Sequence, residues 1–204
     1  MPDNDDIPEM TDAQKARMKV ARGAYDHAFG AVLRGEADDT VDASFQQFLQ
    51  TGSVYAETRD LIRVPDDAGA FRGGLIRIMR RIPDGWGRAI GVEAGWYRLI
   101  TDLDEALAQL DSFYEVSQVK QKFGGLCYRA YPSDGFTGDV TEFDRLIAET
   151  ERQSWSTCEQ CGQPGLLQET CRPGGPRSVR TLCPSCAASG DRLGRSYYPV
   201  PEEG

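Results

Sequence analysis

Two pairs of cysteines near the C-terminus constrain the fold of this chain more than any other feature. The pairs are Cys158 with Cys161 and Cys183 with Cys186, and two residues separate the cysteines of each pair. A tight turn between two such cysteines lets both sulfur atoms face one ion, and Zn²⁺ prefers four ligands in a tetrahedron. Twenty-one residues separate the pairs, close to the spacing of known four-cysteine sites. The sequence therefore predicts one structural zinc site.

The alternatives to a structural zinc site are two disulfides, a redox dithiol and a catalytic zinc site. The N-terminus is acidic and lacks the apolar run of a signal peptide, so we expect a cytoplasmic protein whose thiols stay reduced. Four cysteines would close the metal shell, which disfavours catalysis at the ion. Cys171 lies between the pairs and remains an alternative ligand, whereas Cys127 is expected to be a small buried residue. No stretch approaches the roughly 20 apolar residues of a membrane span.

The pattern along the chain predicts an α+β protein with an N-terminal helical segment, a core of helix and β-hairpin, and a C-terminal four-cysteine module. The module is expected to be a zinc ribbon or treble-clef-like. The expected segments are a disordered acidic tail at 1–10, a helical region at 11–64, the helix and hairpin core at 65–154, the zinc-binding module at 155–190 and a tail at 191–204.

Periodic apolar residues predict helices, and β-prone runs around glycines predict hairpins. The segment 75–82 is ambiguous between helix and strand, and we interpret it as a helix because four of its five large apolar residues share a helical face, namely Leu75, Ile78, Met79 and Ile82. The other expected helices are 11–35, 41–50, 53–63, 95–111 and 140–153, with a short one starting near Ala187. The expected hairpins pair 113–122 with 126–131, and 165–170 with 178–182.

The cysteine module contains few large apolar side chains, so it cannot order itself by burial alone. Zinc binding contributes on the order of 10–16 kcal/mol in small sites, and this becomes folding free energy. Metal removal is therefore predicted to unfold 155–190 while helix 95–111 and its hairpin survive.

The net charge of −9 argues against a protein that coats nucleic acid non-specifically. The segment 72–88 nevertheless carries five arginines and a single aspartate. Such a patch is often only a solvated face, but it could also meet an anion. The candidate contacts with an anion or nucleic acid are Arg72, Arg77, Arg80, Arg81, Arg88, Lys120 and Lys122.

Three stretches carry a resemblance to a known group of proteins. They are GWYRLI at 95–100, QVKQKFGGL at 118–126 and the cysteine pairs that begin with CEQCGQPG at 158–165. In this order they resemble uncharacterised zinc-cluster proteins of tailed bacteriophages and bacteria, over about residues 70–190. The resemblance implies zinc and a phage or mobile-element setting, and it implies no reaction.

The sequence contains no phosphate loop, no G-x-S-x-G motif and only one histidine, His27, which we expect near the surface. We therefore expect a non-catalytic, zinc-stabilised protein that binds another macromolecule, a protein partner before a nucleic acid, as a phage accessory factor. One alternative is nucleic-acid binding through the patch from Arg72 to Arg88. A second is an enzyme that uses the paired carboxylates Asp102, Asp104 and Glu105, although acids at a helix start are expected from the helix dipole alone.

Overall fold

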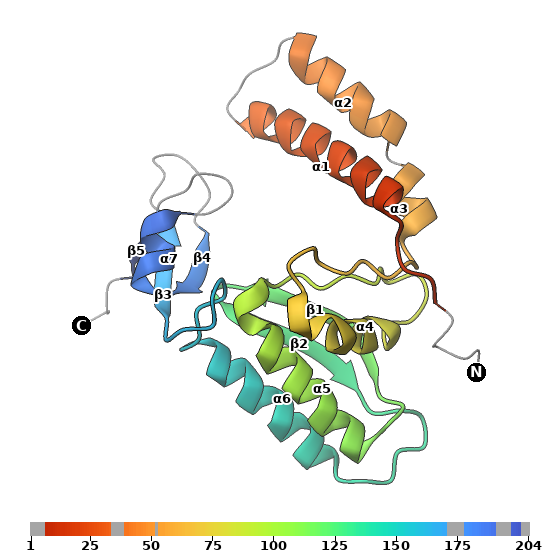
Figure 1. Cartoon of the computed structure of the whole chain (residues 1–204), viewed down its shortest axis with the longest axis vertical. Coiled ribbons are helices and arrows are strands. Elements are labelled where there is room, and N and C mark those ends of the chain that lie inside the picture. The colour runs from red at the N-terminus through yellow and green to blue at the C-terminus, as the bar shows by residue number, and fades with distance from the viewer. Residues whose placement is uncertain (1–6, 34–38, 52, 171–177, 191–196, 201–204) are drawn as a thin grey trace. The chain divides into compact units, whose positions relative to one another are not determined.

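The chain folds into two compact units (Figure 1). The computed structural model describes residues 7–33, 39–51, 53–170, 178–190 and 197–200. Unit 1 comprises Met1–Arg63 and Asp84–Arg88, and unit 2 comprises Val64–Pro83 and Ala89–Gly204. Unit 2 thus contains both the helix and hairpin core and the cysteine module, which the sequence analysis treated as separate segments.

Unit 1 is helical, with α1 (Asp12–Leu33), α2 (Asp39–Thr51) and α3 (Ser53–Thr58). Thr11 and Gln14 form a reciprocal cap at the start of α1: the Gln14 amide donates to Thr11 Oγ1 at 3.2 Å, and the Thr11 amide donates to Gln14 Oε1 at 2.8 Å. His27 is exposed on α1, as expected, with its Nδ1 2.9 Å from Ser44 Oγ.

Two boundaries in unit 1 differ from the prediction for the same reason. The Ile62 amide donates to the Pro8 carbonyl at 3.1 Å, and the Met10 amide donates to the Ile62 carbonyl at 2.9 Å. Residues 7–10 are therefore ordered, although they were assigned to a disordered tail; residues 1–6 lie outside the described residues. This pairing holds Ile62 in an extended conformation, so α3 ends at Thr58 rather than near residue 63.

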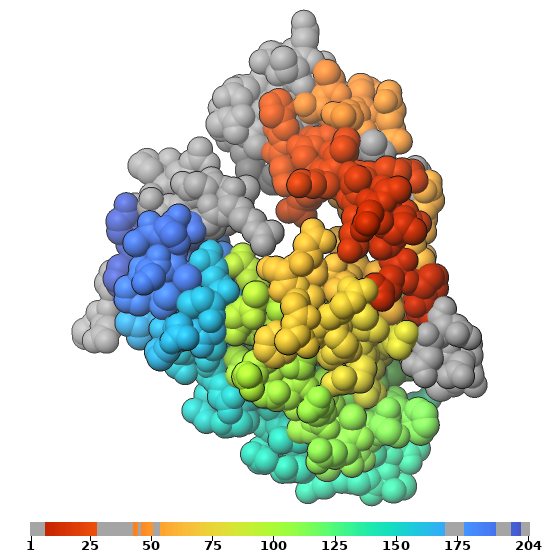
Figure 2. Space-filling model, in the orientation of Figure 1, coloured from red at the N-terminus to blue at the C-terminus, as the bar shows by residue number. Residues whose placement is uncertain are grey.

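The core of unit 2 contains α4 (Arg72–Arg80), α5 (Tyr97–Leu110), α6 (Val140–Ser154) and the hairpin of β1 (Glu115–Lys122) and β2 (Gly125–Tyr131). The ambiguous segment at 75–82 is helical as far as Arg80, and its helix begins three residues earlier than predicted. A short 3-10 turn, η3 (Ala94–Trp96), leads into α5. Helix α5 packs against α4 on one side and α6 on the other, and α6 packs against β2 of the hairpin (Figures 1 and 2).

The cysteine module follows α6 and is built around β3 (Leu166–Thr170), β4 (Val179–Leu182), α7 (Pro184–Ser189) and β5 (Tyr197–Pro199). The strands form an antiparallel sheet in the order β4-β3-β5. The third strand lies in the segment predicted as a tail, where the buried Tyr197 pairs with Thr170. The helix begins at Pro184, earlier than predicted, because proline suits the first position of a helix.

Taken over the described ranges, none of the helices has the length and apolar character that crossing a bilayer requires.

Candidate metal centre

The structure brings the four cysteines of the two pairs to one point. The Sγ atoms of Cys158, Cys161, Cys183 and Cys186 all lie within 4.8 Å of one another. The distance between Cys161 Sγ and Cys183 Sγ is 3.6 Å. Metal–sulfur bonds of about 2.3 Å in a tetrahedron place neighbouring sulfur atoms about 3.8 Å apart. The four thiols therefore fit a tetrahedral metal ion, and this cluster could hold one.

The first pair is held by a tight loop. The Gly162 amide donates to the Cys158 carbonyl at 2.9 Å, and the Cys158 amide donates to the Gln163 carbonyl at 2.7 Å. Gly162 has a φ of 77°, a conformation that favours glycine. The loop thus turns both sulfur atoms of the pair to the same side.

The second pair lies at the start of α7. Cys183 is the N-cap of this helix, and its Sγ accepts a hydrogen bond from the Cys186 amide at 3.4 Å. That backbone hydrogen bond lowers the pKa of Cys183 to about 7, whereas burial raises the pKa of Cys186. Thiolates this close repel one another, so a bound cation would favour ionisation of all four.

Two cysteines, Cys127 and Cys171, are not among the four whose sulfur atoms converge. Cys127 is buried on β2 and is not part of the four-thiol group, as expected. Cys171, the alternative ligand, lies outside the described residues.

The loop of the first cysteine pair docks against the start of α5. The Gly95 amide donates to the Glu159 carbonyl at 2.8 Å, and the indole Nε1 of Trp96 donates to the Thr157 carbonyl at 2.7 Å. A Cβ on Gly95 would overlap the carbonyl oxygen of Cys158 and lie 2.5 Å from the amide nitrogen of Gly162. Only a glycine therefore lets the two backbones approach so closely.

The hairpin turn docks against the sheet of the module. The Gln121 side-chain amide donates to the Val179 carbonyl at 2.6 Å, and the Thr181 hydroxyl donates to the Gly124 carbonyl at 2.7 Å. A Cβ on Gly124 would overlap a methyl group of Leu167. These contacts show that the module is packed onto the core rather than appended to it.

A buried ion pair links the same parts. Arg180 on β4 donates to Glu159 at 2.9 Å and to Glu93, just before η3, at 2.8 Å, and its side chain is 8% exposed. Burial raises the pKa of Glu159, although Arg180 opposes this. Losing one partner of such a buried pair leaves an uncompensated charge, which is strongly destabilising.

The motifs at 95–100 and 118–126 were visible in the sequence, but their role as docking contacts for the cysteine loop and the module sheet was not predicted. The available signal was their glycines, because glycine permits the close approach of another backbone.

The predicted basic patch is not one free cationic surface. Arg77 and Arg81 donate to the two oxygens of Asp104 at 3.2 and 2.8 Å. Arg88 is 4% exposed, pairs with Asp84 at 2.7 Å, and belongs to unit 1 rather than unit 2. Three of the five arginines therefore pair with acids of this chain. Arg72 and Arg80 have interactions of their own.

The three acids of the predicted carboxylate group differ in burial, and two of them, Asp104 and Glu105, share Arg77 as an ion-pair partner. Asp104 is 1% exposed and accepts from Tyr114 Oη at 2.8 Å in addition to the two arginines. Glu105 pairs with Arg77 at 2.8 Å, and Asp102 is exposed. Asp104 is thus a buried structural carboxylate, and burial raises the pKa of Tyr114 so that its hydroxyl stays protonated as the donor.

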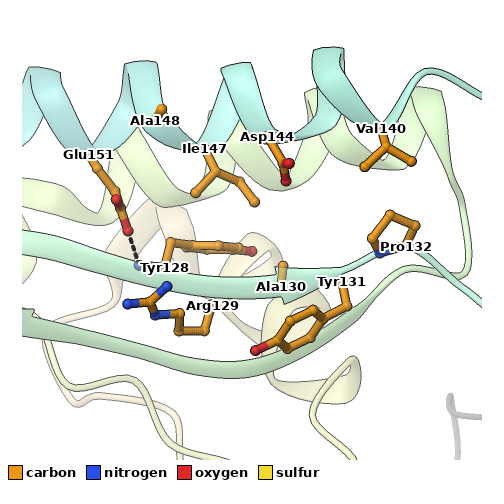
Figure 3. Close-up of a pocket in the computed structure, with 10 residues that line it drawn as sticks. All are labelled: Tyr128, Arg129, Ala130, Tyr131, Pro132, Val140, Asp144, Ile147, Ala148 and Glu151. Carbon is orange, nitrogen blue, oxygen red and sulfur yellow. Dashed lines mark hydrogen bonds between the residues drawn. The ribbon is translucent and has the colours of Figure 1, made fainter.

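An open groove lies between α6 and β2 (Figure 3). Ile147 and Val140 line its helical side, and Ala130 lies on its strand side. The Glu151 carboxylate accepts from the Tyr128 amide at 2.8 Å, so this acid caps the edge of β2. The groove is therefore lined by both apolar and polar side chains, and one of its two acids, Glu151, already accepts a backbone hydrogen bond.

No family model, no curated protein and no solved structure matches the chain.

Proposed function

We propose that this chain is a non-catalytic protein that binds another macromolecule, and that one structural zinc ion on Cys158, Cys161, Cys183 and Cys186 orders its C-terminal module. The observation that carries the proposal is the convergence of four Sγ atoms within 4.8 Å. Four soft sulfur ligands in a tetrahedron suit zinc or iron. Four protein ligands also fill the shell of a zinc ion, which is typical of a structural site.

The arrangement around the cysteines supports a treble-clef-like module rather than a pure ribbon. The loop of the first pair precedes the hairpin of β3 and β4, and α7 carries Cys186 directly after that hairpin. Metal binding requires reduced thiols, and the expected cytoplasmic location would keep them reduced. The resemblance adds a phage or mobile-element setting to this proposal.

Metal analysis combined with thiol titration tests the zinc proposal. We expect one zinc per chain in the purified protein, and no zinc in the double variant Cys183→Ser/Cys186→Ser. The matched control is Cys127→Ser, which changes a buried cysteine outside the group and should keep its zinc. Folded protein without metal, or normal zinc in the double variant, would refute the proposal. If the metal analysis finds iron, and the protein shows visible absorption bands, the site is an iron site rather than a zinc site.

A further inference from the structure

One face of the β1–β2 hairpin carries exposed residues at both of its ends around the buried Gly125 and Cys127, and we call it the hairpin face. The register places Gln118 opposite Arg129, Lys120 opposite Cys127, and Lys122 opposite Gly125. Side chains of opposed residues project from the same side of an antiparallel pair, and alternate residues along a strand share that side. The hairpin face therefore consists of Gln118, Lys120, Lys122, Gly125, Cys127, Arg129 and Tyr131. The opposite face, with Val119 and Tyr128, is buried in the core.

The cations of the hairpin face differ from the ion-paired arginines of unit 2. Lys122 and Arg129 are exposed and Lys120 is half-buried. Among the residues that the structure describes, none of these three forms an ion pair with an acid, in contrast to Arg77, Arg81 and Arg180. Glu115, opposite Tyr131, is an acid at the far end of this face. Within the described part of this protein of net charge −9, three cations thus lie on one face without an ion-pair partner, and the groove that Arg129 lines also contains the acids Asp144 and Glu151.

Exposed aromatic rings flank these cations. Phe123 at the hairpin turn is 73% exposed, with Lys122 Nζ 5.4 Å from the centre of its ring. Trp155 is 47% exposed and lies against Gly125, because a Cβ there would be 2.7 Å from its Cε2. Gly125 is opposite Lys122, so the two rings bracket this lysine. Tyr131, 59% exposed, follows on the same face.

Phe123 occupies a backbone position that phenylalanine does not favour. Its φ is 54° and that of Gly124 is 93°, the positive pair of a tight hairpin turn in which asparagine and glycine are preferred. The exposed ring gains little from burial, so neither the turn nor the core accounts for a phenylalanine here. Strained positions of this kind are enriched at functional sites.

We propose that the hairpin face binds single-stranded nucleic acid, with bases stacked on the exposed rings and phosphates near the three cations. Aromatic rings on a sheet favour single strands, since their unstacked bases present flat surfaces. At about 3.3 Å per residue, β2 spans roughly 20 Å, which matches a short site of about four nucleotides. This inference rests on the proposed function, because it names the class of macromolecule, and it replaces the patch from Arg72 to Arg88 as the contact surface.

Fluorescence anisotropy with the full-length, zinc-loaded protein tests the proposal. The probes are 12-nucleotide oligo(dT), oligo(U) and a duplex of equal length, and the first two distinguish DNA from RNA. We expect at least one single strand to bind more tightly than the duplex. Three phosphate contacts give a slope of about −2 in log affinity against log salt, which is roughly a 20-fold loss between 50 and 200 mM.

Two pairs of variants locate the site. Lys120→Gln/Lys122→Gln should weaken binding about tenfold and make the salt slope shallower by about 1.4. The control Arg145→Gln/Arg152→Gln removes the same charge from ion-paired arginines on α6, and we expect less than a twofold change.

Phe123→Asn separates binding from folding. Asparagine suits the positive φ, so this variant should keep its zinc and melt at a higher temperature, yet bind single strands about fivefold more weakly or worse. A merely structural phenylalanine would leave binding unchanged.

The proposal is overturned if zinc-loaded protein binds no single strand at 50 mM salt, if both charge pairs lose affinity equally, or if an acidic peptide binds this face in place of oligonucleotides. In each of these cases the zinc content is unchanged and the metal part of the proposed function still stands. Loss of zinc from the wild-type protein would refute that part instead.

Discussion

The core of unit 2 and its cysteine module differ in what stabilises them: buried large side chains in the core, and a group of thiols in the module. The core buries large residues completely, among them Trp96, Tyr97, Tyr114, Phe143 and Leu107. Each such side chain contributes roughly 1.5–3 kcal/mol on burial. The buried cluster of the module consists of Cys158, Leu182, Cys183, Ala187 and Tyr197, so two of its five members are thiols. Burial can order the core, whereas the module needs a cross-link.

The difference does not make the two parts independent. Backbone contacts at Gly95 and Gly124 join them, and Arg180 bridges the acids on either side. An ion that orders the module must therefore also order the turn before α5 and the tip of the hairpin. We therefore expect the boundary between the residues that need the metal for their stability and those that do not to lie within the core, rather than at the contact between core and module.

Metal removal should produce the largest effect and show where that boundary lies. In hydrogen exchange we expect chelation, or Cys183→Ser/Cys186→Ser, to abolish protection over 157–170 and 178–190, because about 10–16 kcal/mol of metal binding is lost. Residues 93–96 and 121–125 should lose protection in part. The buried positions of α4 and the later turns of α5 should keep it.

Two outcomes would break the comparison. Collapse of protection throughout α4 and α5 would mean that burial alone does not order the core. Unchanged protection at 93–96 would mean that the docking contacts form without the metal.

A single methyl group at Gly95 should have the next largest effect. Gly95→Ala places a Cβ against the backbone of Cys158, Glu159 and Gly162, none of which is a flexible side chain. We expect the free energy of unfolding to fall by about 3 kcal/mol, measured by urea titration of the metal-bound protein. Zinc affinity should also fall, because the cysteine loop is displaced.

Gly73→Ala is the matched control for that substitution. Gly73 lies within α4, and a Cβ there would meet nothing within 4 Å. Alanine favours helix by up to about 1 kcal/mol over glycine, so this variant should be slightly more stable. Equal losses in both variants would show that the close approach at Gly95 does not matter.

Local patterns in the sequence predicted most of the helices, the β1–β2 hairpin and the convergence of the four cysteines. Each of these depends on spacing within one segment: two residues between cysteines, a helical repeat, or glycines in a turn. The third strand of the module was missed because Tyr197 pairs with Thr170, and the segment around it has no periodic pattern. The order at residues 7–10 likewise depends on a partner about fifty residues away.

The pairing of charges could not be predicted along the chain. Five arginines near one another in sequence suggested a free basic surface, yet Arg77 and Arg81 pair with Asp104, on a different helix, and Arg88 lies in the other unit. Lys120 and Lys122, which form no ion pair with any described residue, were named among the contacts, but Arg129, which lies on the same face, could be placed there only from the strand register. Which acids neutralise which bases is a property of packing, and it leaves no local pattern.

Asp111 offers the smallest and most selective test, because it orders the core far in sequence from the four clustered thiols. It is 7% exposed at the end of α5, where Oδ2 accepts from the Ser133 amide at 2.6 Å and Oδ1 from the Phe113 amide at 2.9 Å. Burial raises the pKa of this carboxyl, but these hydrogen bonds outweigh burial and hold the pKa of Asp111 below its ordinary value.

Asp111→Asn should lower the free energy of unfolding by about 1–3 kcal/mol at pH 7, because the amide of Asn cannot accept both backbone hydrogen bonds. The folded-state pKa is depressed, so the contribution is complete above the unfolded pKa of about 3.9 and is lost as the pH falls through the lower folded value. Denaturant titrations of both proteins from pH 7 to pH 2.5 should therefore converge only in acid. Both proteins have the same thiolates, so the effect of acid on the thiolates cancels in the difference between their free energies of unfolding. A gap that closes already near pH 6, where the thiolates begin to take up protons, would tie Asp111 to the metal module and remove the distinction between the two regions.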